Sequence, residues 1–464
     1  MKAVLDPDRV LADGLAAIRS QYQVPRSFPQ PVLEAAETAA RRVPTAHVDR
    51  TDIPFVTLDP ASATDLDQAF WIETSGSDLL LRYAIADVAW FVEDGDPIDV
   101  EAWHRGTTLY LPDGKASLYP PVLSEGAASL LPDGPRPAIL FTVRVAPDGA
   151  VKLDGAERAL VRSRAKLAYE TVVDSDLPPQ FAELARRIAL AEAERGASRV
   201  DPPEQEVARR ADGGYALAFR ARHASEDQNA ALSLAANLAI ADVLRAHHTG
   251  LFRVMAEPDA AAVSRLRNTA RALGIAWPHA QPLARFRDGL DAADPNQAAL
   301  MLAIRRAGQG ASYAPWRADA LPWHAAVAAT YVHATAPLRR LADRYVIRAT
   351  LAAMNGQPVP EAVSAAFERL PKVMARADAL GGQIDRAVID LAEAVMLDGR
   401  EGEIFPAVVT DIDQRGARMQ LADLPVVTRI DAPGAAPGTA LQVRLTDADP
   451  AKRVIRFEAM GAMA

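Results

Sequence analysis

Three aspartates gathered in one short segment are the part of this sequence best suited to do chemistry. Between Phe55 and Phe70 the chain reads FVTLDPASATDLDQAF, so Asp59, Asp65 and Asp67 follow one apolar run and precede another. Carboxylates packed this closely repel one another unless a cation lies among them, and hard oxygen ligands select Mg²⁺ or Mn²⁺. The segment therefore predicts a divalent-metal site.

The segment also has a simpler interpretation. Asp is favoured in turns and at helix N-termini, so a loop that holds several of them is often only well solvated. Two apolar runs around the loop favour the metal site, because a loop clamped between strands is rigid. An EF-hand is excluded, since the loop after Asp65 lacks the central Gly and the closing Glu.

The amino-acid composition limits which class of protein this can be and which catalytic groups it can use. The length of 464 residues predicts about two to four domains. The absence of cysteine excludes disulfides, zinc–thiolate sites and thiol nucleophiles, which leaves carboxylates, imidazoles, hydroxyls or metals. No run of about 18 uninterrupted apolar residues is present, and the N-terminus has no signal-peptide apolar region. These features predict a cytoplasmic enzyme without a membrane span.

Net charge limits the kind of partner. A formal charge of −9 predicts long-range repulsion from phosphate, which argues against loose coating of a duplex. It says little about one strand that enters an internal tunnel, because arginines can line a channel while the exterior stays acidic. The candidates for such a lining are Arg339, Arg340, Arg344 and Arg348.

The elements that must position these residues fall into three parts, of which the first is helical. Apolar residues between Val10 and Tyr22 recur at helical spacing, and prolines at 25, 29 and 31 break the pattern before it resumes. Residues 1–48 are therefore predicted to form a short helical module. A helix-turn-helix-like module and a simple helical cap are equally compatible with this pattern.

The second part, residues 49–400, mixes early strands with late helices. Strand-like runs cover 55–58, 79–83 and 138–145, and alanine-rich helical stretches cover 182–197, 229–246, 260–273 and 338–354. We predict an α+β domain whose strands carry the carboxylates and whose helices wall a cleft.

The third part, residues 401–464, contains five short strand-like runs separated by Gly, Pro and Asp turns. This pattern predicts an OB-fold β-barrel. Few aromatic residues occupy its exposed positions, so any hold on nucleic acid would depend on its arginines, namely Arg415, Arg418, Arg429 and Arg444. A barrel that only braces the second part is the alternative.

The acidic segment, from Thr57 to Ala69, resembles the signature loop of the ribonuclease II (RNB) family of 3′-to-5′ exoribonucleases. Further blocks that resemble the family follow in the same order at 83–92, 105–112, 121–130 and 333–340. The resemblance covers approximately residues 54–396. It implies an RNB-type α+β catalytic domain, with the barrel as a C-terminal RNA-binding domain.

The resemblance also implies roles for the acidic residues. The metal ligands would be Asp59, Asp65 and Asp67, with two Mg²⁺ or Mn²⁺ ions during catalysis. Gln68 stands where the family has a fourth Asp, and its amide oxygen is predicted to hold one ion more weakly. Asp67 and Arg339 would be catalytic, because Arg339 lies at the family position that contacts the phosphate being cleaved.

RNA-binding roles follow from the same resemblance. Tyr110 and Tyr169 match aromatics that stack on bases, and Asp385 lies where relatives place an acid near the sugars. Arg340 and Arg344 would be structural or would follow the backbone farther out. His333 is interpreted as a packing or hydrogen-bonding residue. A family acidic pair is replaced by alanines here, with Glu226 and Asp227 about one turn earlier.

Together these features predict a metal-dependent exoribonuclease of the ribonuclease II type. It would degrade single-stranded RNA processively from the 3′ end, release nucleoside 5′-monophosphates and act as a monomer. Two alternatives remain open. One is an RNA-binding or regulatory member of the family that Gln68 has weakened catalytically. The other is a metal-dependent phosphatase, which the carboxylate loop alone would permit but which leaves the barrel and Tyr110 unexplained.

Overall fold

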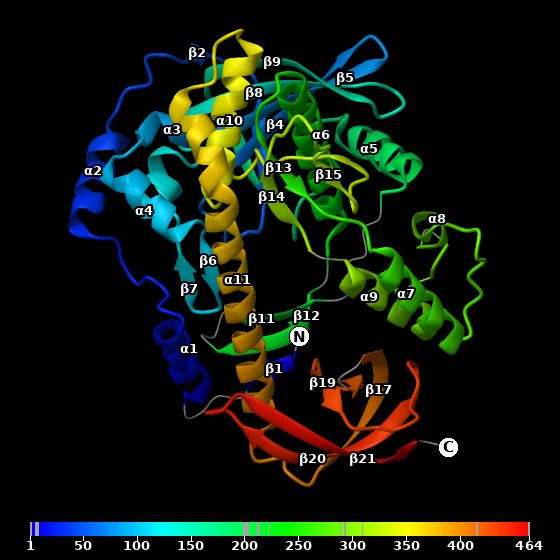
Figure 1. The fold of residues 1–464 in the computed structure, drawn as a ribbon. Helices are drawn as coiled ribbons and strands as arrows, with labels where there is room; N and C mark the ends of the chain where they lie inside the picture. The colour runs from blue at the N-terminus through cyan, green and yellow to red at the C-terminus, as the bar shows by residue number, and fades with distance from the viewer. Residues whose placement is uncertain are drawn as a thin grey trace.

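A computed structural model of the chain describes residues 2–4, 9–197, 204–210, 214–220, 222–287, 289–291, 294–308, 310–413 and 416–462. An α+β body forms one end of the molecule, and the long helix α11 (Glu361–Leu397) runs from it to a β-barrel at the other end (Figure 1). This arrangement confirms the predicted fold class.

The α+β body is built on a seven-stranded sheet with the order β10-β3-β4-β5-β8-β9-β2. Its outer pairs, β10 with β3 and β2 with β9, are parallel, and the other neighbours are antiparallel. The strands are β2 (Val48–Asp49), β3 (Phe55–Asp59), β4 (Gln68–Ser75), β5 (Asp78–Ala86), β8 (Arg136–Val145), β9 (Val151–Val161) and β10 (Ser163–Ala168). The acidic segment therefore joins two strands inside the sheet.

Helices cover this sheet and complete its core. The central helix α6 (Ala224–Ala246) packs on β8 and β9, and it is flanked by α5 (Phe181–Arg195) and α10 (Leu341–Met354). Small residues such as Ala235, Ala236 and Ala239 are buried along α6. Since they carry short side chains, the helix can lie close to the sheet, which brings its polar residues near the acidic segment.

The N-terminal helices α1 (Val10–Gln21) and α2 (Gln30–Ala40) occupy separate places. Helix α1 buries Leu11, Leu15 and Ile18 in a core shared with α11, whereas α2 packs on α4 (Pro97–Arg105) and belongs to the core of the sheet. A short strand that the sequence did not predict, β1 (Lys2–Val4), pairs with β12 (Tyr215–Phe219). The two helices thus brace different parts of the body; the domain boundaries at 48 and 400 stay a prediction.

The core around α1 also supports a hairpin of β6 (Leu109–Leu111) and β7 (Gly114–Ala116). Leu109, Leu111 and Ala116 point into this core, so Tyr110 and its cross-strand neighbour Lys115 point the other way. Arg19 of α1 holds the turn, with 2.8 Å from Nε and from Nη2 to the two carboxylate oxygens of Asp113.

The C-terminal barrel has five strands in the order β19-β18-β17-β20-β21, and contacts between β19 and β21 nearly close it. The strands are β17 (Ile404–Asp413), β18 (Gly416–Leu421), β19 (Val427–Ile430), β20 (Ala440–Asp449) and β21 (Val454–Ala462). Val409, Met419 and Val443 are buried inside, and Leu397 at the end of α11 joins them. The predicted OB-like barrel is confirmed.

The remaining elements are a small helical lobe and several short helices and strands. A small helical lobe of α7 (Ala260–Ala272), α8 (Leu283–Arg287) and α9 (Pro295–Ala307) has a core of its own and lies between the body and the barrel (Figure 1). The shorter elements are α3 (Val88–Phe91), a π-helix (Leu123–Ala127), a 3₁₀ turn (Asp174–Asp176), β11 (Gln205–Arg209), β13 (Leu251–Val254), β14 (Ser312–Pro315), β15 (Trp323–His324) and β16 (Ala329–Thr330).

Across the described parts of the chain, we find no helix with the length and apolar character that a bilayer span requires.

Candidate active site

The acidic segment is fixed at both ends and in its middle. Asp59 is the last residue of β3, and Gln68 is the first residue of β4. Between them Leu66 is fully buried, and its N–H donates to Ser129 Oγ at 2.9 Å. The Ser129 hydroxyl in turn donates to the carbonyl oxygen of Thr64 at 2.8 Å. These bonds hold the carboxylates on a rigid loop, as the flanking strands predict.

Asp67 lies at the inner end of this loop. Only 5% of the residue is exposed, and its Oδ1 accepts a hydrogen bond of 2.7 Å from the N–H of Leu338. Its Oδ2 lies 3.4 Å from Nε of Arg339. Burial raises the pKa of Asp67 to about 8, although Arg339 and the Leu338 N–H favour its charged form. Burial thus disfavours the bare charge on this carboxylate.

Asp59 is in a similar position. It lies on the wall of a pocket, where burial raises its pKa to about 6 and Arg339 acts in the opposite direction. Asp65 contributes to the raised pKa of both other aspartates through charge repulsion. The three carboxylates therefore affect one another, as their spacing in the sequence predicts.

Asp65 itself turns toward the β6–β7 hairpin. Its Oδ1 accepts from Lys115 Nζ at 2.7 Å, and its Oδ2 accepts from the hydroxyl of Tyr110 at 3.1 Å. Lys115 also lies 3.2 Å from a carboxylate oxygen of Glu125. An ammonium group thus occupies the place of a cation beside Asp65.

Arg339 reaches the pocket from the loop before α10. Its carbonyl oxygen accepts from Thr107 Oγ1 at 2.8 Å and from Thr108 N at 3.0 Å, so its backbone is held. Gly106, just before these threonines, has a φ of 75°, and a Cβ there would lie 3.0 Å from the Cβ of Ala377, so a glycine lets this segment pack against α11. The guanidinium is 47% exposed, which leaves it available to a ligand.

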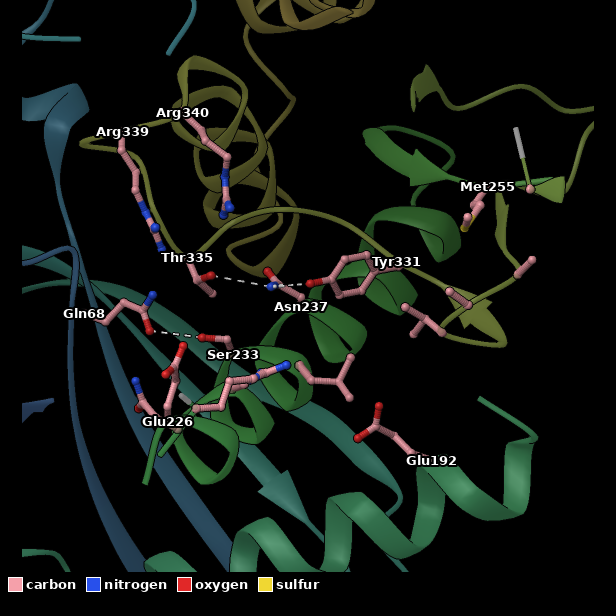
Figure 2. A pocket seen from close by; sticks show the side chains of 18 of the residues that line it. Gln68, Glu192, Glu226, Ser233, Asn237, Met255, Tyr331, Thr335, Arg339 and Arg340 are labelled. Atoms are coloured by element: carbon pink, nitrogen blue, oxygen red, sulfur yellow. Dashed lines mark hydrogen bonds between the residues drawn. The ribbon is translucent and has the colours of Figure 1, made fainter. Parts of the chain in front are cut away.

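The pocket beside these residues has a volume of about 770 Å³. Gln68 and Arg339 lie at one end of it, and Glu192 and Met255 lie toward the other (Figure 2). Asp59 also lines the pocket. Asn229, Ser233 and Asn237, which are spaced four apart on one face of α6, line the wall between. The Asn237 amide donates to Tyr331 and Thr335 at 3.3 and 3.5 Å, which ties α6 to the loop that leads to Arg339.

Gln68 has its amide oxygen engaged. The hydroxyls of Tyr83 and Ser233 both donate to Oε1, the latter at 3.1 Å. The sequence predicts this oxygen as a metal ligand, and that role stays a prediction.

The predicted RNA-binding residues are not all brought together. Tyr169 lines the pocket, and its hydroxyl accepts from Asn229 at 2.8 Å. Arg340 also lines the pocket, with Nε 3.0 Å from a carboxylate oxygen of Asp343. Tyr110 is half-exposed on the Asp65 side and is not part of the pocket lining. Asp385 lies exposed on α11 and is not part of it either.

Two arginines predicted to line a channel face elsewhere. Arg344 is buried, where it donates to Asp99, and Arg348 pairs with Asp94 at 2.5 Å. They follow the start of α10 by one and two turns, and neither is part of the pocket lining. Arg344 thus has the structural place that was one of the two roles expected for it, and the expectation that Arg348 lines a channel is not met. Arg418 and Arg429 are exposed cross-strand neighbours on the barrel; Arg415 lies outside the described residues.

His333 and Glu226 can also be placed. Nδ1 of His333 lies 2.7 Å from the hydroxyl of Tyr313, and burial lowers its pKa well below the ordinary value, as expected for a packing histidine. Glu226 lines the pocket and pairs with Arg220 at 2.5 Å. Asp227, in contrast, pairs with Arg222 and is not part of the lining.

The fit of the site to a divalent cation can be judged from its donors. Asp59 and Asp67 offer hard oxygen atoms whose burial disfavours a bare charge, which suits Mg²⁺ or Mn²⁺. In the described part of the chain, however, no three His, Asp or Glu side chains are arranged to hold a metal ion. In the acidic segment, Asp65 is turned toward Lys115.

Sequence reasoning missed Lys115, Tyr83 and the stripe on α6. Lys115 follows an Asp-Gly pair that is a hairpin signal, and a hairpin would place it across from Tyr110. Asn229, Ser233 and Asn237 stand out as polar residues at spacing four in an alanine-rich helix. Tyr83 has no such signal, since it alternates with buried residues in an ordinary strand.

Comparison with known proteins gives two matches to family models. Residues 47–356 match the RNB domain, and residues 403–460 match the RNase II-type exonuclease C-terminal S1 domain. Ribonuclease R of Aquifex aeolicus is 27% identical over 442 residues, or 88% of this chain and 62% of that protein. Ribonuclease R of Escherichia coli is 27% identical over 91% of this chain and 57% of that protein. The chain thus spans about 60% of the length of these relatives.

Solved structures share the fold at low identity. RNase R of Mycoplasma genitalium, in complex with ribose-methylated single-stranded RNA, aligns with a TM-score of 0.86 and 19% identity over 98% of this chain and 78% of that one. Yeast Ssd1, described as a pseudonuclease, aligns with a TM-score of 0.68 and 15% identity over 98% of this chain and 58% of that one. Active and inactive proteins can therefore have this fold, so function must be argued from the residues.

Proposed function

Because the chain belongs to the RNB family, we propose that it is a hydrolytic 3′-to-5′ exoribonuclease that removes nucleoside 5′-monophosphates from single-stranded RNA. The observation that carries this proposal is the pairing of Asp67 with Arg339, whose side chain lines the pocket. A buried carboxylate and an exposed guanidinium on a rigid frame offer one group for a cation and one for a phosphate.

Divalent cations are part of the proposal. Asp59, Asp67 and, after Lys115 releases it, Asp65 would hold Mg²⁺ or Mn²⁺, and such ions supply an activated water and shield the charge that develops on the phosphate. The protein's contribution is to keep the carboxylates on a fixed loop and to keep bulk water away from Asp67. In this interpretation Lys115 neutralises Asp65 before cations bind.

The other residues would hold and orient RNA. Arg339 would bind non-bridging oxygens of the phosphate being cleaved, since a guanidinium can donate two parallel hydrogen bonds. Tyr169 in the pocket and Tyr110 beside Asp65 offer rings on which bases stack without sequence preference. The exposed Arg418 and Arg429 of the barrel would contact the strand farther from its 3′ end, and a strand held at both places would support processive cleavage.

The test uses a 5′-labelled oligoribonucleotide with Mg²⁺. The wild-type chain should shorten it from the 3′ end and release mononucleotides, whereas Asp67→Asn should bind it without shortening it. Asp52→Asn, the same change at an exposed site outside the loop, serves as the control and should cleave normally. An Asp67→Asn variant that degrades RNA at the wild-type rate would show that the site is misassigned.

A duplex with a 3′ overhang tests the ribonuclease II type of activity. An enzyme of that type should stop near the duplex, and continued shortening through the paired region would place this chain with enzymes that degrade structured RNA.

A catalytically weakened RNA-binding protein is the second candidate. Two observations favour it: Lys115 neutralises Asp65, and both hydroxyls beside Gln68 occupy its amide oxygen. Purified chain that binds poly(A) but releases no monophosphate with Mg²⁺ or Mn²⁺ would establish this candidate and exclude the first.

A further inference from the structure

The amide of Gln68 is held in one orientation by two hydroxyl groups. Tyr83 is fully buried, and its hydroxyl and that of Ser233 both donate to Gln68 Oε1. The two hydroxyl oxygens also lie 2.8 Å from each other, so the three groups form a closed cluster. A buried hydroxyl that loses its partner is costly, and the cluster therefore resists any change that withdraws Oε1.

Counting protons shows why the oxygen and not the nitrogen faces the cluster. Each hydroxyl carries one proton that needs an acceptor. With Oε1 inward, both protons have one. With the amide reversed, its NH₂ group would donate to both hydroxyls, one hydroxyl proton could go to the other oxygen, and the second would have no acceptor within the cluster. The hydrogen-bond pattern therefore fixes the amide orientation.

This orientation turns the amide nitrogen toward the pocket. Figure 2 shows Nε2 of Gln68 on the side of Thr335 and Arg339, away from Ser233. Among the residues that the structure describes, Nε2 has no hydrogen-bond partner, and Gln68 and Arg339 both line the pocket. The pocket thus presents two donors from different elements, one from the start of β4 and one from the loop before α10.

We propose that Gln68 contacts the phosphate of bound RNA through Nε2, as a partner of Arg339, and does not ligate a cation. This inference rests on the exoribonuclease function proposed above. An oxygen with two hydrogen bonds would have to give up both to ligate a metal ion, whereas a free NH₂ group and a guanidinium match the two non-bridging oxygens of a phosphodiester. Tyr83 and Ser233 then act as positioning residues for Gln68.

Cation binding without RNA tests whether Gln68 ligates a cation. Mn²⁺ is titrated into the full chain and free Mn²⁺ is followed by electron paramagnetic resonance, for wild type and Gln68→Ala. Both should bind the same number of ions, with affinities that differ by less than about twofold, because no ligand is lost. A Gln68→Ala affinity more than about tenfold weaker would show that Gln68 is a ligand and would overturn the proposal.

RNA binding in EDTA, measured by fluorescence anisotropy with a short oligoribonucleotide, tests whether Gln68 contacts the phosphate. Loss of a donor to a charged phosphate should weaken binding by Gln68→Ala about tenfold. Gln68→Glu should weaken it further, since it places a carboxylate against the phosphate. Gln357→Glu, the same charge change at an exposed site away from the pocket, should bind like wild type. Equal affinities for all four proteins would overturn the proposal.

Tyr83→Phe tests the orientation of the amide. Tyr83 is buried and cannot touch RNA, so the variant should lose RNA affinity only by freeing the Gln68 amide to rotate, while its Mn²⁺ binding stays unchanged. Unchanged RNA affinity in Tyr83→Phe would overturn the positioning role. These assays need no cleavage: a wild-type chain that binds RNA in this way but releases no nucleotide would refute the proposed function alone.

Discussion

Two regions of this molecule hold a buried carboxylate with a raised pKa, and they differ in what faces it. Asp67 lies beside the pocket, where burial raises its pKa to about 8. Glu393 on α11 is 3% exposed, and burial raises its pKa to about 7. Its Oε1 accepts from Gln205 Nε2 at 2.7 Å and from Val427 N at 2.8 Å, which joins α11, β11 and the barrel. Burial alone therefore does not distinguish the proposed catalytic carboxylate from one that joins structural elements.

The neighbouring amides sharpen the contrast. Gln205 Nε2 donates to Glu393 and also to the carbonyl oxygen of Pro425 at 2.7 Å, so both of its protons are used inside the protein. Gln68 has its oxygen satisfied and its protons directed at the pocket. In the region around Glu393 the polar groups hydrogen-bond to one another. At the pocket, the guanidinium of Arg339 and the amide NH₂ of Gln68 can still donate to a ligand. Unused donors, more than burial, mark the site.

Exchange of each carboxylate for its amide should separate the two regions most clearly. We expect Asp67→Asn to lower the single-turnover rate of nucleotide release by about 10³-fold or more, because it removes charge that holds cations at the reacting phosphate. Glu393→Gln should leave that rate within about twofold, because the joint that Glu393 forms between α11, β11 and the barrel touches no reacting group. Similar losses in both variants would mean that the barrel joint takes part in catalysis.

Arg339 should give the next largest effect. Arg339→Ala should slow release by about 10²- to 10³-fold, since a donor to developing negative charge is lost. Arg339→Lys should recover only part of the rate, because an ammonium cannot form two parallel hydrogen bonds. A loss below about threefold in Arg339→Ala would remove Arg339 from the site.

Thermal unfolding at several pH values should reveal both carboxylates without any substrate. Each has a folded-state pKa above its ordinary value of 3.8 or 4.5, so its protonated form is favoured in the folded state. Their contribution to stability is complete below about pH 4 and is lost as pH rises through 7 to 8. In EDTA, the melting temperature of wild type should therefore fall between pH 5 and pH 8.

Variants and Mg²⁺ distinguish the contributions of the two regions to the melting temperature. Asp67→Asn and Glu393→Gln should each reduce the fall in melting temperature between pH 5 and pH 8. Mg²⁺ should raise the melting temperature of wild type and Glu393→Gln at pH 8 but have less effect on Asp67→Asn, because the proposal places the cations at the acidic segment and not beside Glu393. An equal Mg²⁺ effect in all three proteins would contradict the assignment of the cation site.

Lys115 should have the smallest effect. Lys115→Met frees Asp65 from its ammonium partner, and a partly exposed pair of this kind is worth up to about 1 kcal/mol, so Mn²⁺ affinity should rise by up to about fivefold. Lys152→Met, at an exposed lysine paired with Asp154, should leave Mn²⁺ affinity unchanged. Weaker Mn²⁺ binding in Lys115→Met would mean that Lys115 supports the cation site instead of competing with it.

Local patterns in the sequence determined much of this protein. Alternating apolar residues and turn signals predicted the five barrel strands, and helical spacing predicted α1, α2 and α6. The acidic segment and its neighbouring blocks identified the family, because the segment's residues lie close in sequence and are held by strands on both sides. Such features depend on a few adjacent residues, which is why they can be read without a structure.

Only the tertiary structure determined which residues of the site contact one another. The hydrogen bond from Leu338 to Asp67 joins residues 271 positions apart, and Lys115 reaches Asp65 only because the hairpin packs on α1 and α11. Arg344 of α10 is buried where it donates to Asp99, a residue 245 positions away in the sequence. The orientation of the Gln68 amide depends on a tyrosine from the next strand and a serine from a distant helix. These contacts are set by packing between remote segments, and no local pattern contains them.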